Sequence, residues 1–303
     1  MNLDQFPTKV SPPAGYFRSN RDRLVANLTP KIHAATNACI LLKGGSQHYN
    51  YDDDVNQAPF SQDNHFWWCT GVGFADCHLA IDVSTNKATL FVHQPDVSAK
   101  TWSLVLDPPD YLSRFEVDDC KPNTSIEEFF LAQNFDQVLT LDGVNCYSGN
   151  GPLKPEFLWL QKFMVNQNIL YSTMNETRVH KTADEVALLK QVGQLASDGH
   201  IFVMRNLKPG MSESHVQSLF RFYNGWYMDS KTPYEEIAAV GGNGAILHYK
   251  TNDDILKDGE MILFDGGAKV HHFCSDITTT WPLNGKFTQR QAEWYNVVLK
   301  ASW

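Results

Sequence analysis

The sequence predicts an α/β domain with a mixed sheet over residues 1–175, followed by an α+β domain over residues 176–303. Three observations lead to this prediction. A chain of 303 residues exceeds the size at which one hydrophobic core usually keeps growing. Its 43% hydrophobic and 12% aromatic content is sufficient for packed cores. Strand-like and helix-like runs alternate in the first part, whereas helical patterns precede a series of strands in the second.

The first domain is expected to contain buried strands, a hairpin and several helices. Residues 17–28 are amphipathic and predict a helix, and residues 38–42 are typical of a buried strand. The runs 78–83 and 88–92 flank a polar tetrapeptide, which predicts a hairpin. Further expected segments are a strand at 137–141 and helices near 98–106, 124–133 and 153–165.

The second domain is expected to begin with two helices after a loop-rich stretch at 166–179. Thr182 and Glu185 have the spacing of a capping box, in which the hydroxyl caps the helix and the carboxylate reaches back. A Pro-Gly pair ends this helix, and Ser212 is placed to cap the next one. Strand-like runs follow at 237–240, 245–248, 261–264, 269–273 and 277–281, before a last helix that begins near residue 294.

Composition and charge exclude several classes of protein. The net charge of −9 leaves no basic footprint for nucleic acid. No apolar run approaches the ~18 residues of a membrane-spanning helix. The six cysteines lack CxxC spacing, which favours buried free thiols in a reducing compartment. The first residues lack the apolar segment of a signal peptide. We therefore expect a cytoplasmic protein that binds neither nucleic acid nor membranes.

The residues most suggestive of chemistry are Asp265 and Asp276, which lie in strand-like runs. A carboxylate among strand-forming residues is costly unless it is paired or binds a cation. The glycines after Asp265 allow a sharp turn, so two antiparallel strands could present both carboxylates to one point. Hard divalent cations prefer such ligands, and a bridging carboxylate can hold two metals ~3.5–4 Å apart for hydrolysis. The alternative is that Asp265 caps a turn and Asp276 bonds to Ser275 or Thr278.

Three histidines are further candidates. His248 follows a glycine-rich segment and a short predicted strand, so it could donate a hydrogen bond to a substrate carbonyl or a tetrahedral oxyanion. The alternative for His248 is a structural histidine satisfied by its neighbours. Adjacent His271 and His272 would point to opposite faces of a strand, so we interpret both as structural or exposed.

Three blocks of sequence together resemble the Xaa-Pro dipeptidase (prolidase) and aminopeptidase P family, which are metallopeptidases of the pita-bread fold. The segment 59–71, PFSQDNHFWWCTG, resembles the signature of their N-terminal domain. The segment 207–213, LKPGMSE, resembles the link between the first two helices of the catalytic domain. The segments 242–249, 259–267 and 274–278 resemble the first half of the active site. The resemblance extends over nearly the whole chain and is greatest to eukaryotic-type prolidase.

The resemblance implies roles for five residues. Asp265 would chelate one of two divalent metal ions and Asp276 would bridge both, with Mn²⁺ as the usual metal. His248 would contact the substrate and help to stabilise the transition state. Tyr234 would line the substrate pocket. Trp102 of the N-terminal domain would approach the active site across a homodimer.

The resemblance also implies a reaction, the hydrolysis of the imide bond before proline in a dipeptide. A hydroxide bridging the two metals would attack the carbonyl, and His248 would help to hold the developing charge. Two alternatives stay open. One is an aminopeptidase P that acts on longer Xaa-Pro peptides, and the other is a non-catalytic pita-bread protein that binds peptides or a protein partner. The retained aspartate pair weighs against the second alternative.

Part of the family's pattern has no counterpart in the chain. The remaining ligands, one histidine and two glutamates, lie in the second half of the family's catalytic domain. We therefore expect residues 176–303 to form a truncated pita-bread domain of a longer enzyme. Other interpretations are a short relative that uses its first domain for binding, or a chain made to study that domain. We expect the isolated chain to be inactive unless a C-terminal segment complements it.

Overall fold

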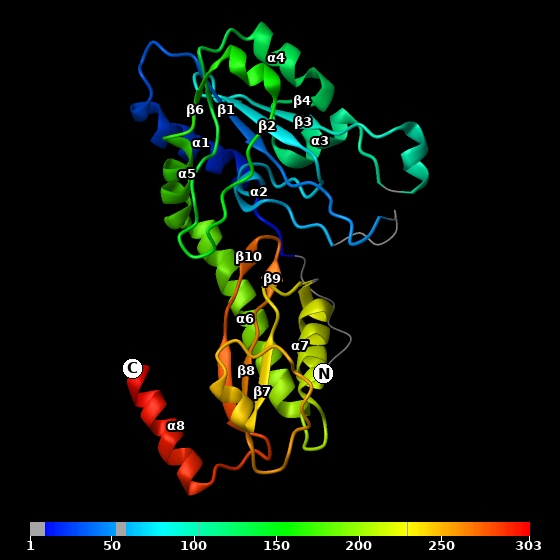
Figure 1. The fold of residues 1–303 in the computed structure, drawn as a ribbon, viewed down its shortest axis with the longest axis vertical. Helices are drawn as coiled ribbons and strands as arrows, with labels where there is room; N and C mark the ends of the chain where they lie inside the picture. Colours follow the sequence, from blue (N-terminus) through cyan, green and yellow to red (C-terminus); the bar gives the residue numbers. More distant parts are fainter. Residues whose placement is uncertain (1–9, 53–58, 103, 229) are drawn as a thin grey trace. The chain divides into compact units, whose positions relative to one another are not determined.

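The structure, a computed structural model, describes residues 10–52, 59–102, 104–228 and 230–303 (Figure 1). It contains two compact units, Pro13–Lys181 and Thr182–Trp303, the second of which also includes residues 10–12. The predicted boundary after residue 175 lies inside helix α5 (Leu170–Val179) of the first unit. The first residues of the chain, where we expect no signal peptide, lie outside the described part.

The first unit is built on a mixed six-stranded sheet, which confirms the predicted α/β class. Its strand order is β4-β3-β2-β1-β5-β6. The pairs β1/β2 and β2/β3 are antiparallel, whereas β3/β4, β1/β5 and β5/β6 are parallel. The strands are β1 (Ala38–Lys43), β2 (His78–Asp82), β3 (Ala88–Val92), β4 (Asp119–Pro122), β5 (Gln137–Leu139) and β6 (Met164–Asn166).

The β2–β3 hairpin follows from the chemistry of its turn. Asp82 ends β2, and its carboxylate accepts a hydrogen bond from the Ser84 amide at 2.8 Å. Asn86 then takes a left-handed conformation with φ of 56°, which asparagine tolerates better than most residues. The hairpin predicted from the two apolar runs is therefore confirmed.

Both faces of this sheet are buried. Along β1, Ile40 and Leu42 belong to one apolar cluster, whereas Cys39 and Leu41 belong to another, because successive side chains of a strand alternate between faces. Helix α1 contacts both α2 and α5. The helices of this unit are α1 (Tyr16–Leu28), α2 (Asn64–Thr70), α3 (Pro108–Phe115), α4 (Ile126–Ala132) and α5.

The polar residues in the segment 59–71 have structural roles. The buried Gln62 side chain accepts from the Gly45 amide at 2.6 Å through Oε1 and donates to the Phe74 carbonyl at 2.8 Å through Nε2. Asp63 caps α2 by accepting from two amides of its first turn, both at 2.9 Å. These bonds join two loops to the start of α2, so this signature builds the fold of the first unit.

The second unit packs two long helices against a three-stranded antiparallel sheet of order β11-β8-β7. The Thr182 hydroxyl accepts from the Glu185 amide at 3.2 Å, and the Glu185 carboxylate accepts from the Thr182 amide at 2.8 Å. The predicted capping box is therefore confirmed. The elements are α6 (Ala183–Asn206), α7 (Glu213–Met228), β7 (Ile237–Val240), β8 (Met261–Asp265), β9 (Lys269–Val270), β10 (Phe273–Cys274), β11 (Thr278–Pro282) and α8 (Gln289–Ala301).

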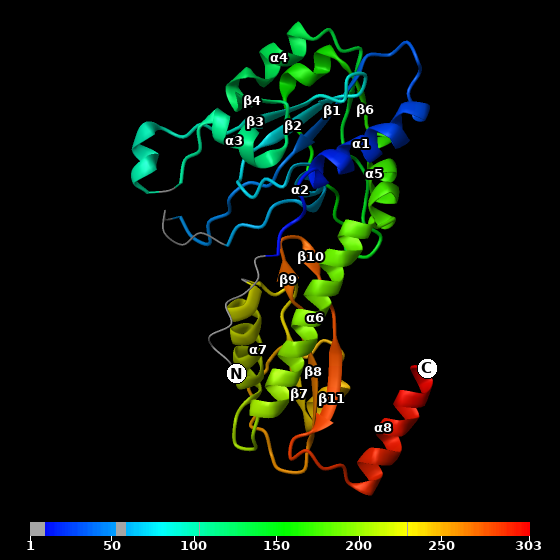
Figure 2. The same cartoon turned by 180° about the vertical axis from the view of Figure 1, so that it is seen from behind.

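The two faces of the three-stranded sheet have different surroundings. Ile262 and Phe264 of β8 belong to the cluster that includes α6 and α7, whereas Leu263 packs with Ile237. Figure 2 shows α6 in front of these strands. Directly paired residues of an antiparallel sheet point to the same face, and Asp265 pairs with Ile237. Asp265 therefore lies on the face away from α6 and α7.

Helix prediction is wrong in parts of the first unit. The helices expected near 98–106 and 153–165 are short 3-10 turns within irregular segments. Residues 166–179, expected to form a loop, contain α5. Tertiary packing outweighs local propensity here, because Trp159 and Met174 are both buried in the apolar clusters of the sheet. In the described part of the chain, no helix is long and apolar enough to cross a membrane.

Strand prediction is wrong at two places in the second unit. The strand expected over 245–248 is a turn that follows the 3-10 helix η5 (Gly241–Ala245). The strand expected over 269–273 is the β9/β10 hairpin, because His271 turns the chain with φ of 54°. The His271 ring also bonds through Nε2 to the Val10 carbonyl at 2.8 Å. The two adjacent histidines therefore lie in a turn rather than on opposite faces of a strand.

Candidate metal centre

The two aspartates singled out from the sequence share one hydrogen-bonding partner. The Tyr234 hydroxyl lies 2.5 Å from Asp265 Oδ1 and 3.0 Å from Asp276 Oδ1. A hydroxyl carries one proton, so it donates to one carboxylate at a time. Both carboxylates therefore converge on a single point.

The surroundings of Tyr234 keep its phenol protonated. Burial raises the pKa of Tyr234 well above its ordinary value, and the hydrogen bonds and charges of Asp265 and Asp276 raise it further. A phenolate here would face two carboxylates. Tyr234 therefore acts as a hydrogen-bond donor that offsets part of the repulsion between the two aspartates.

Strand pairing holds the two carboxylates near one another. Asp265 ends β8, and Asp276 precedes β11, whose first residue Thr278 pairs with Asp265. The Gly266 amide donates to the Ile277 carbonyl at 3.0 Å and extends this pairing by one bond. The separation of the two aspartates is therefore set by backbone hydrogen bonds between neighbouring strands.

Gly267 allows a close approach between two segments of this region. A Cβ added at Gly267 would lie 2.1 Å from the Ser275 carbonyl oxygen and 2.8 Å from the Pro233 side chain. The Ser275 amide donates to the Ala268 carbonyl at 2.9 Å, which fixes the same approach. The second glycine after Asp265 is therefore required by packing, since any larger residue would push against the backbone.

In the described structure, Asp276 does not hydrogen-bond to its neighbours in the chain, as the structural alternative for this residue requires. Within the described residues, Asp276 forms no hydrogen bond with Ser275 or Thr278. The Ser275 hydroxyl instead accepts from the Ala268 amide at 3.0 Å. Both aspartates are left facing Tyr234, which is the arrangement that a shared ligand requires.

The chemistry of the donor set suits a hard divalent cation. Asp265 is half-buried and Asp276 is exposed, so two carboxylates with one phenol beside them are open to a ligand. Oxygen ligands of this type suit Mg²⁺, Ca²⁺ and Mn²⁺. Across the part of the chain that the structure describes, no three His, Cys, Asp or Glu side chains are grouped to hold a metal. The aspartates therefore fit a cation but supply only part of its coordination shell.

His248 lies in the turn after η5 rather than on β8 or β11. It is exposed and follows the 3-10 helix η5. In the described structure it forms no hydrogen bond or ion pair with Tyr234, Asp265 or Asp276. The structure thus joins three of the predicted site residues by hydrogen bonds, and among the residues described His248 is not bonded to them.

A buried carboxylate that the sequence did not single out fixes the base of the His248 loop. Glu213, fully buried at the start of α7, accepts from the Val240 amide at 2.8 Å and from Asn243 Nδ2 at 3.0 Å. Its other oxygen accepts from the Tyr249 hydroxyl at 2.8 Å and the Asp254 amide at 3.1 Å. These partners are far from Glu213 in the chain, so no local pattern could reveal them.

Trp102 belongs to the first unit and follows a 3-10 helix there. Its side chain is 88% exposed. An exposed indole of this size is available to a partner surface. Its approach to an active site across a homodimer stays a prediction.

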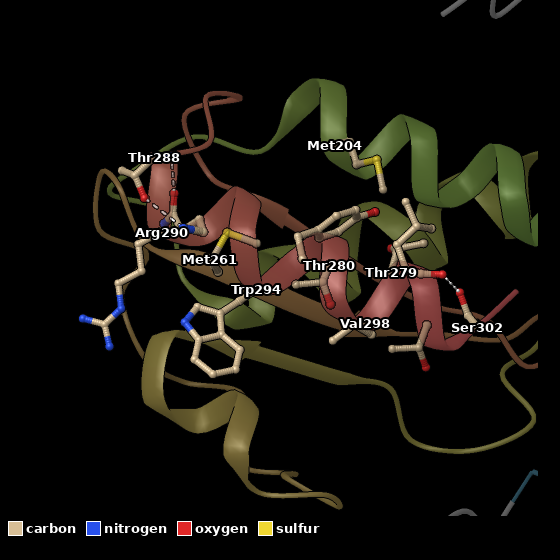
Figure 3. Close-up of a pocket in the computed structure, with 13 residues that line it drawn as sticks. Met204, Met261, Thr279, Thr280, Thr288, Arg290, Trp294, Val298 and Ser302 are labelled. Carbon is tan, nitrogen blue, oxygen red and sulfur yellow. Dashed lines mark hydrogen bonds between the residues drawn. The ribbon is translucent and has the colours of Figure 1, made fainter.

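A cavity of about 860 Å³ lies beside α8 in the second unit (Figure 3). Trp294 and Val298 of α8, Met261 of β8 and Met204 of α6 line it. Its lining is mainly apolar side chains and hydroxyls, with Arg290 as the charged member. It contains none of the predicted site residues and no pair of carboxylates, so the chemistry predicted for this unit is not expected there.

Two family models match separate parts of the chain. Residues 17–139 match "Aminopeptidase P, N-terminal domain", and residues 187–303 match "Metallopeptidase family M24". The first match lies within the first structural unit and the second within the second unit. The Asp265–Asp276 pair therefore belongs to the part that matches the metallopeptidase family.

Curated relatives match nearly the whole chain. The Xaa-Pro dipeptidase of Rattus norvegicus is 35% identical over 297 residues, which cover 95% of this chain and 60% of that protein. The Homo sapiens Xaa-Pro dipeptidase is also 35% identical, over 96% of this chain and 60% of its own length. The probable Xaa-Pro aminopeptidase of Fusarium vanettenii is 30% identical over 93% of this chain and 59% of its own. The chain thus spans about 60% of the length of these relatives.

Solved structures share the fold. Zinc-substituted Escherichia coli aminopeptidase P in complex with product matches with a TM-score of 0.79 and 24% identity, covering 97% of this chain and 67% of that chain. Proline aminopeptidase P II from Yersinia pestis matches with a TM-score of 0.78 and 24% identity, covering 94% of this chain and 66% of its own. Both matches concern the fold alone. With the two domain matches and the dipeptidase relatives, they place this chain in the Xaa-Pro dipeptidase and aminopeptidase P family of pita-bread metallopeptidases.

Proposed function

We propose that the chain carries the N-terminal domain and part of the metal centre of a Xaa-Pro dipeptidase, which hydrolyses the imide bond before proline. The observation that supports this proposal is the convergence of Asp265 and Asp276 on Tyr234 within the unit that matches the metallopeptidase family. The 35% identical relatives named as Xaa-Pro dipeptidases favour a dipeptide substrate.

Asp265 and Asp276 would be carboxylate ligands to two divalent metal ions, and Mn²⁺ is the metal that we expect. Bound ions of this kind polarise a substrate carbonyl and lower the pKa of a water molecule. The chain itself would hold the two carboxylates together through strand pairing, and Tyr234 would donate a hydrogen bond to them. Two protein ligands form an incomplete shell, so we expect weak binding by these residues alone.

His248 and Tyr234 would contact the substrate. His248 is exposed, so its ring can reach a substrate carbonyl and donate a hydrogen bond to its oxygen. The Glu213 network would keep the base of this loop rigid, while Tyr234 would line the pocket beside the aspartates. Trp102 would approach this site in a cytoplasmic homodimer. A C-terminal segment would supply the remaining ligands, without which we expect no turnover.

Aminopeptidase P is the second candidate, and a specific observation favours it. The chain is 30% identical to a probable Xaa-Pro aminopeptidase and has aminopeptidase P structures among its fold neighbours. Such an enzyme would act on longer Xaa-Pro peptides with the same aspartates. The non-catalytic alternative is disfavoured, because a binding protein has no need for two carboxylates that converge on one hydroxyl.

The test uses the protein purified from its source, whose intact mass is compared with the 34.3 kDa of this chain. Mn²⁺ content and proline release from Gly-Pro are measured, with Gly-Pro-Ala as the longer competitor. Asp276→Asn should abolish both, whereas Asp258→Asn, at an exposed aspartate of the same unit, should change neither. Two bound ions without release from Gly-Pro would contradict dipeptidase activity. Preference for the tripeptide would favour aminopeptidase P, and absence of bound metal would favour a binding protein.

A further inference from the structure

A histidine outside the predicted site lies buried beneath the aspartate turn. His200 of α6 is 2% exposed, and its ring lies 4.7 Å from the Phe264 ring and 5.2 Å from the Phe220 ring, measured between centroids. A polar ring in such apolar surroundings is costly unless its nitrogens are hydrogen-bonded. The partners of His200 therefore explain why an imidazole is present here.

Both ring nitrogens of His200 have partners. Nε2 lies 3.0 Å from the Gly266 carbonyl oxygen, and Nδ1 lies 2.8 Å from Thr279 Oγ1. A carbonyl can only accept, so Nε2 carries the proton and donates to it. Nδ1 is then unprotonated and accepts from the Thr279 hydroxyl. Burial lowers the pKa of His200, which favours this neutral ring.

The two partners of His200 lie close in the chain to the two aspartates, one just past the end of β8 and the other on β11. Gly266 directly follows Asp265 at the end of β8, and Thr279 lies on β11, three residues after Asp276. One imidazole thus ties the end of β8 to the start of β11 from the helix side of the sheet. Tyr234 bonds to the side chains of both aspartates, whereas His200 bonds to a backbone carbonyl beside Asp265 and to a side-chain hydroxyl on β11.

We propose that His200 is a positioning residue that sets the separation of Asp265 and Asp276 for a divalent cation. Its donor bond fixes the Gly266 carbonyl, and its acceptor bond fixes Thr279, so neither strand end can shift without breaking one of them. This inference rests on the proposed metal-dependent function. It assigns to α6 a role in the metal centre beyond packing.

The test compares two variants of His200 with a packing control. His200→Phe keeps an aromatic ring in the cluster and loses both hydrogen bonds, whereas His200→Gln keeps one donor and one acceptor. Phe220→Leu disturbs the same cluster and touches neither bond. The affinity for Mn²⁺ is measured by electron paramagnetic resonance titration, and the thermal midpoint is measured without metal.

We expect His200→Phe to weaken Mn²⁺ binding roughly 10- to 100-fold, the usual effect of removing a residue that orients metal ligands. His200→Gln should recover most of this loss, and Phe220→Leu should lower the thermal midpoint while binding Mn²⁺ as the wild type does. Equal Mn²⁺ affinity of His200→Phe and Phe220→Leu would overturn the positioning role alone. A wild-type protein that binds no Mn²⁺ would overturn the metal centre, and the inference with it.

Amide hydrogen exchange gives a readout that needs no metal. The Gly266 amide bonds to the Ile277 carbonyl between the two strands that His200 ties together. His200→Phe should speed exchange at Gly266 relative to the rest of β8, and Thr279→Val should do so less, because it removes one bond of the two. Unchanged protection of Gly266 in His200→Phe would contradict the proposal whatever the Mn²⁺ affinity.

Discussion

The Tyr234 hydroxyl lies 2.5 Å from Asp265 Oδ1, although 31 residues separate the two in the chain. Tyr234 precedes β7 and Asp265 ends β8, and the antiparallel pairing of Ile237 with Asp265 brings the two together. The same hydroxyl also bonds to Asp276, which lies two residues before β11. Residues at the ends of β7, β8 and β11 thus meet at the Tyr234 hydroxyl. Its hydrogen bond uses a carboxylate lone pair that a cation could otherwise bind.

Tyr234→Phe should therefore make the chain more dependent on metal. Without the shared donor, repulsion between the two carboxylates should lower the stability of the metal-free protein by about 1 kcal/mol. A cation would relieve more repulsion in the variant, so the rise in thermal midpoint on adding Mn²⁺ should be larger than in the wild type. Thermal unfolding with and without Mn²⁺ measures both effects.

Tyr295→Phe is a matched control for this prediction, because Tyr295 lies on α8 and is 39% exposed. It should leave both thermal midpoints unchanged. If Mn²⁺ raises the thermal midpoint of Tyr234→Phe and of the wild type equally, Tyr234 does not compete with the metal for the aspartates.

Features specified by nearby residues could be predicted from the sequence. The capping box of Thr182 and Glu185 depends on residues three positions apart, and the β2–β3 hairpin depends on a short polar turn. The convergence of Asp265 and Asp276 is of the same kind, because a short connection and a glycine pair join their strands. In each case the interacting groups are close in the chain.

Features that depend on distant residues could not be predicted. Glu213 bonds to groups 27 to 41 residues away, and His200 bonds to groups 66 and 79 residues away. Neither lies in a pattern that indicates a partner, and an isolated buried polar residue gives no local signal. For the same reason, only the family resemblance points to Tyr234. The turn at His271 gives no sequence signal, because a non-glycine residue there adopts a positive φ.

Gly267→Ala should disturb the aspartate pair. The new Cβ would press on the Ser275 carbonyl oxygen, and overpacking of this kind typically costs 1–3 kcal/mol. Because Ser275 directly precedes Asp276, the displaced backbone should also weaken Mn²⁺ binding. Urea unfolding and Mn²⁺ titration of the same preparation measure the two effects.

Gly193→Ala separates this packing effect from the general effect of replacing glycine. Gly193 lies within α6, and an added Cβ there meets no atom within 4 Å. The alanine should stabilise the helix by up to about 1 kcal/mol and leave Mn²⁺ binding unchanged. A Gly267→Ala protein as stable as Gly193→Ala would show that the approach to Ser275 is not close in solution.

Acidification should destabilise the first unit through His78. Burial lowers the pKa of His78 below its ordinary 6.5, although a hydrogen bond to Asn123 opposes this shift. Between the folded and unfolded pKa values the unfolded chain binds more protons. The stability contributed by neutral His78 is therefore complete above pH 6.5 and is lost as the pH falls below it towards the folded value.

Amide exchange of β2 between pH 7.5 and 5.5, corrected for intrinsic rates, measures this dependence. His78→Gln can keep a bond to Asn123 but does not titrate, so its stability should vary less with pH over this range. His48→Gln, at an exposed position, should behave as the wild type does. An identical pH dependence in His78→Gln and the wild type would exclude His78 as the titrating group.

Glu213→Ala should loosen the loop that carries His248. The change leaves the Val240 and Asp254 amides and the Tyr249 hydroxyl without their buried acceptor. The Val240 amide and the Tyr249 hydroxyl are buried, and each unsatisfied buried group costs about 1–3 kcal/mol. A loss of at least ~2 kcal/mol is therefore expected in denaturant unfolding of the second unit.

The effect on the loop separates anchoring from a general loss of stability. Amides of residues 241–250 should exchange faster in Glu213→Ala than in the wild type, at a denaturant concentration where α6 stays protected. Glu235→Ala removes an exposed carboxylate two residues before β7 and should change neither stability nor loop exchange by more than ~0.5 kcal/mol. If the loop and α6 lose protection together in Glu213→Ala, Glu213 supports the whole unit rather than this loop. If the loop alone loses protection, the position of His248 depends on a carboxylate that lies outside the predicted site.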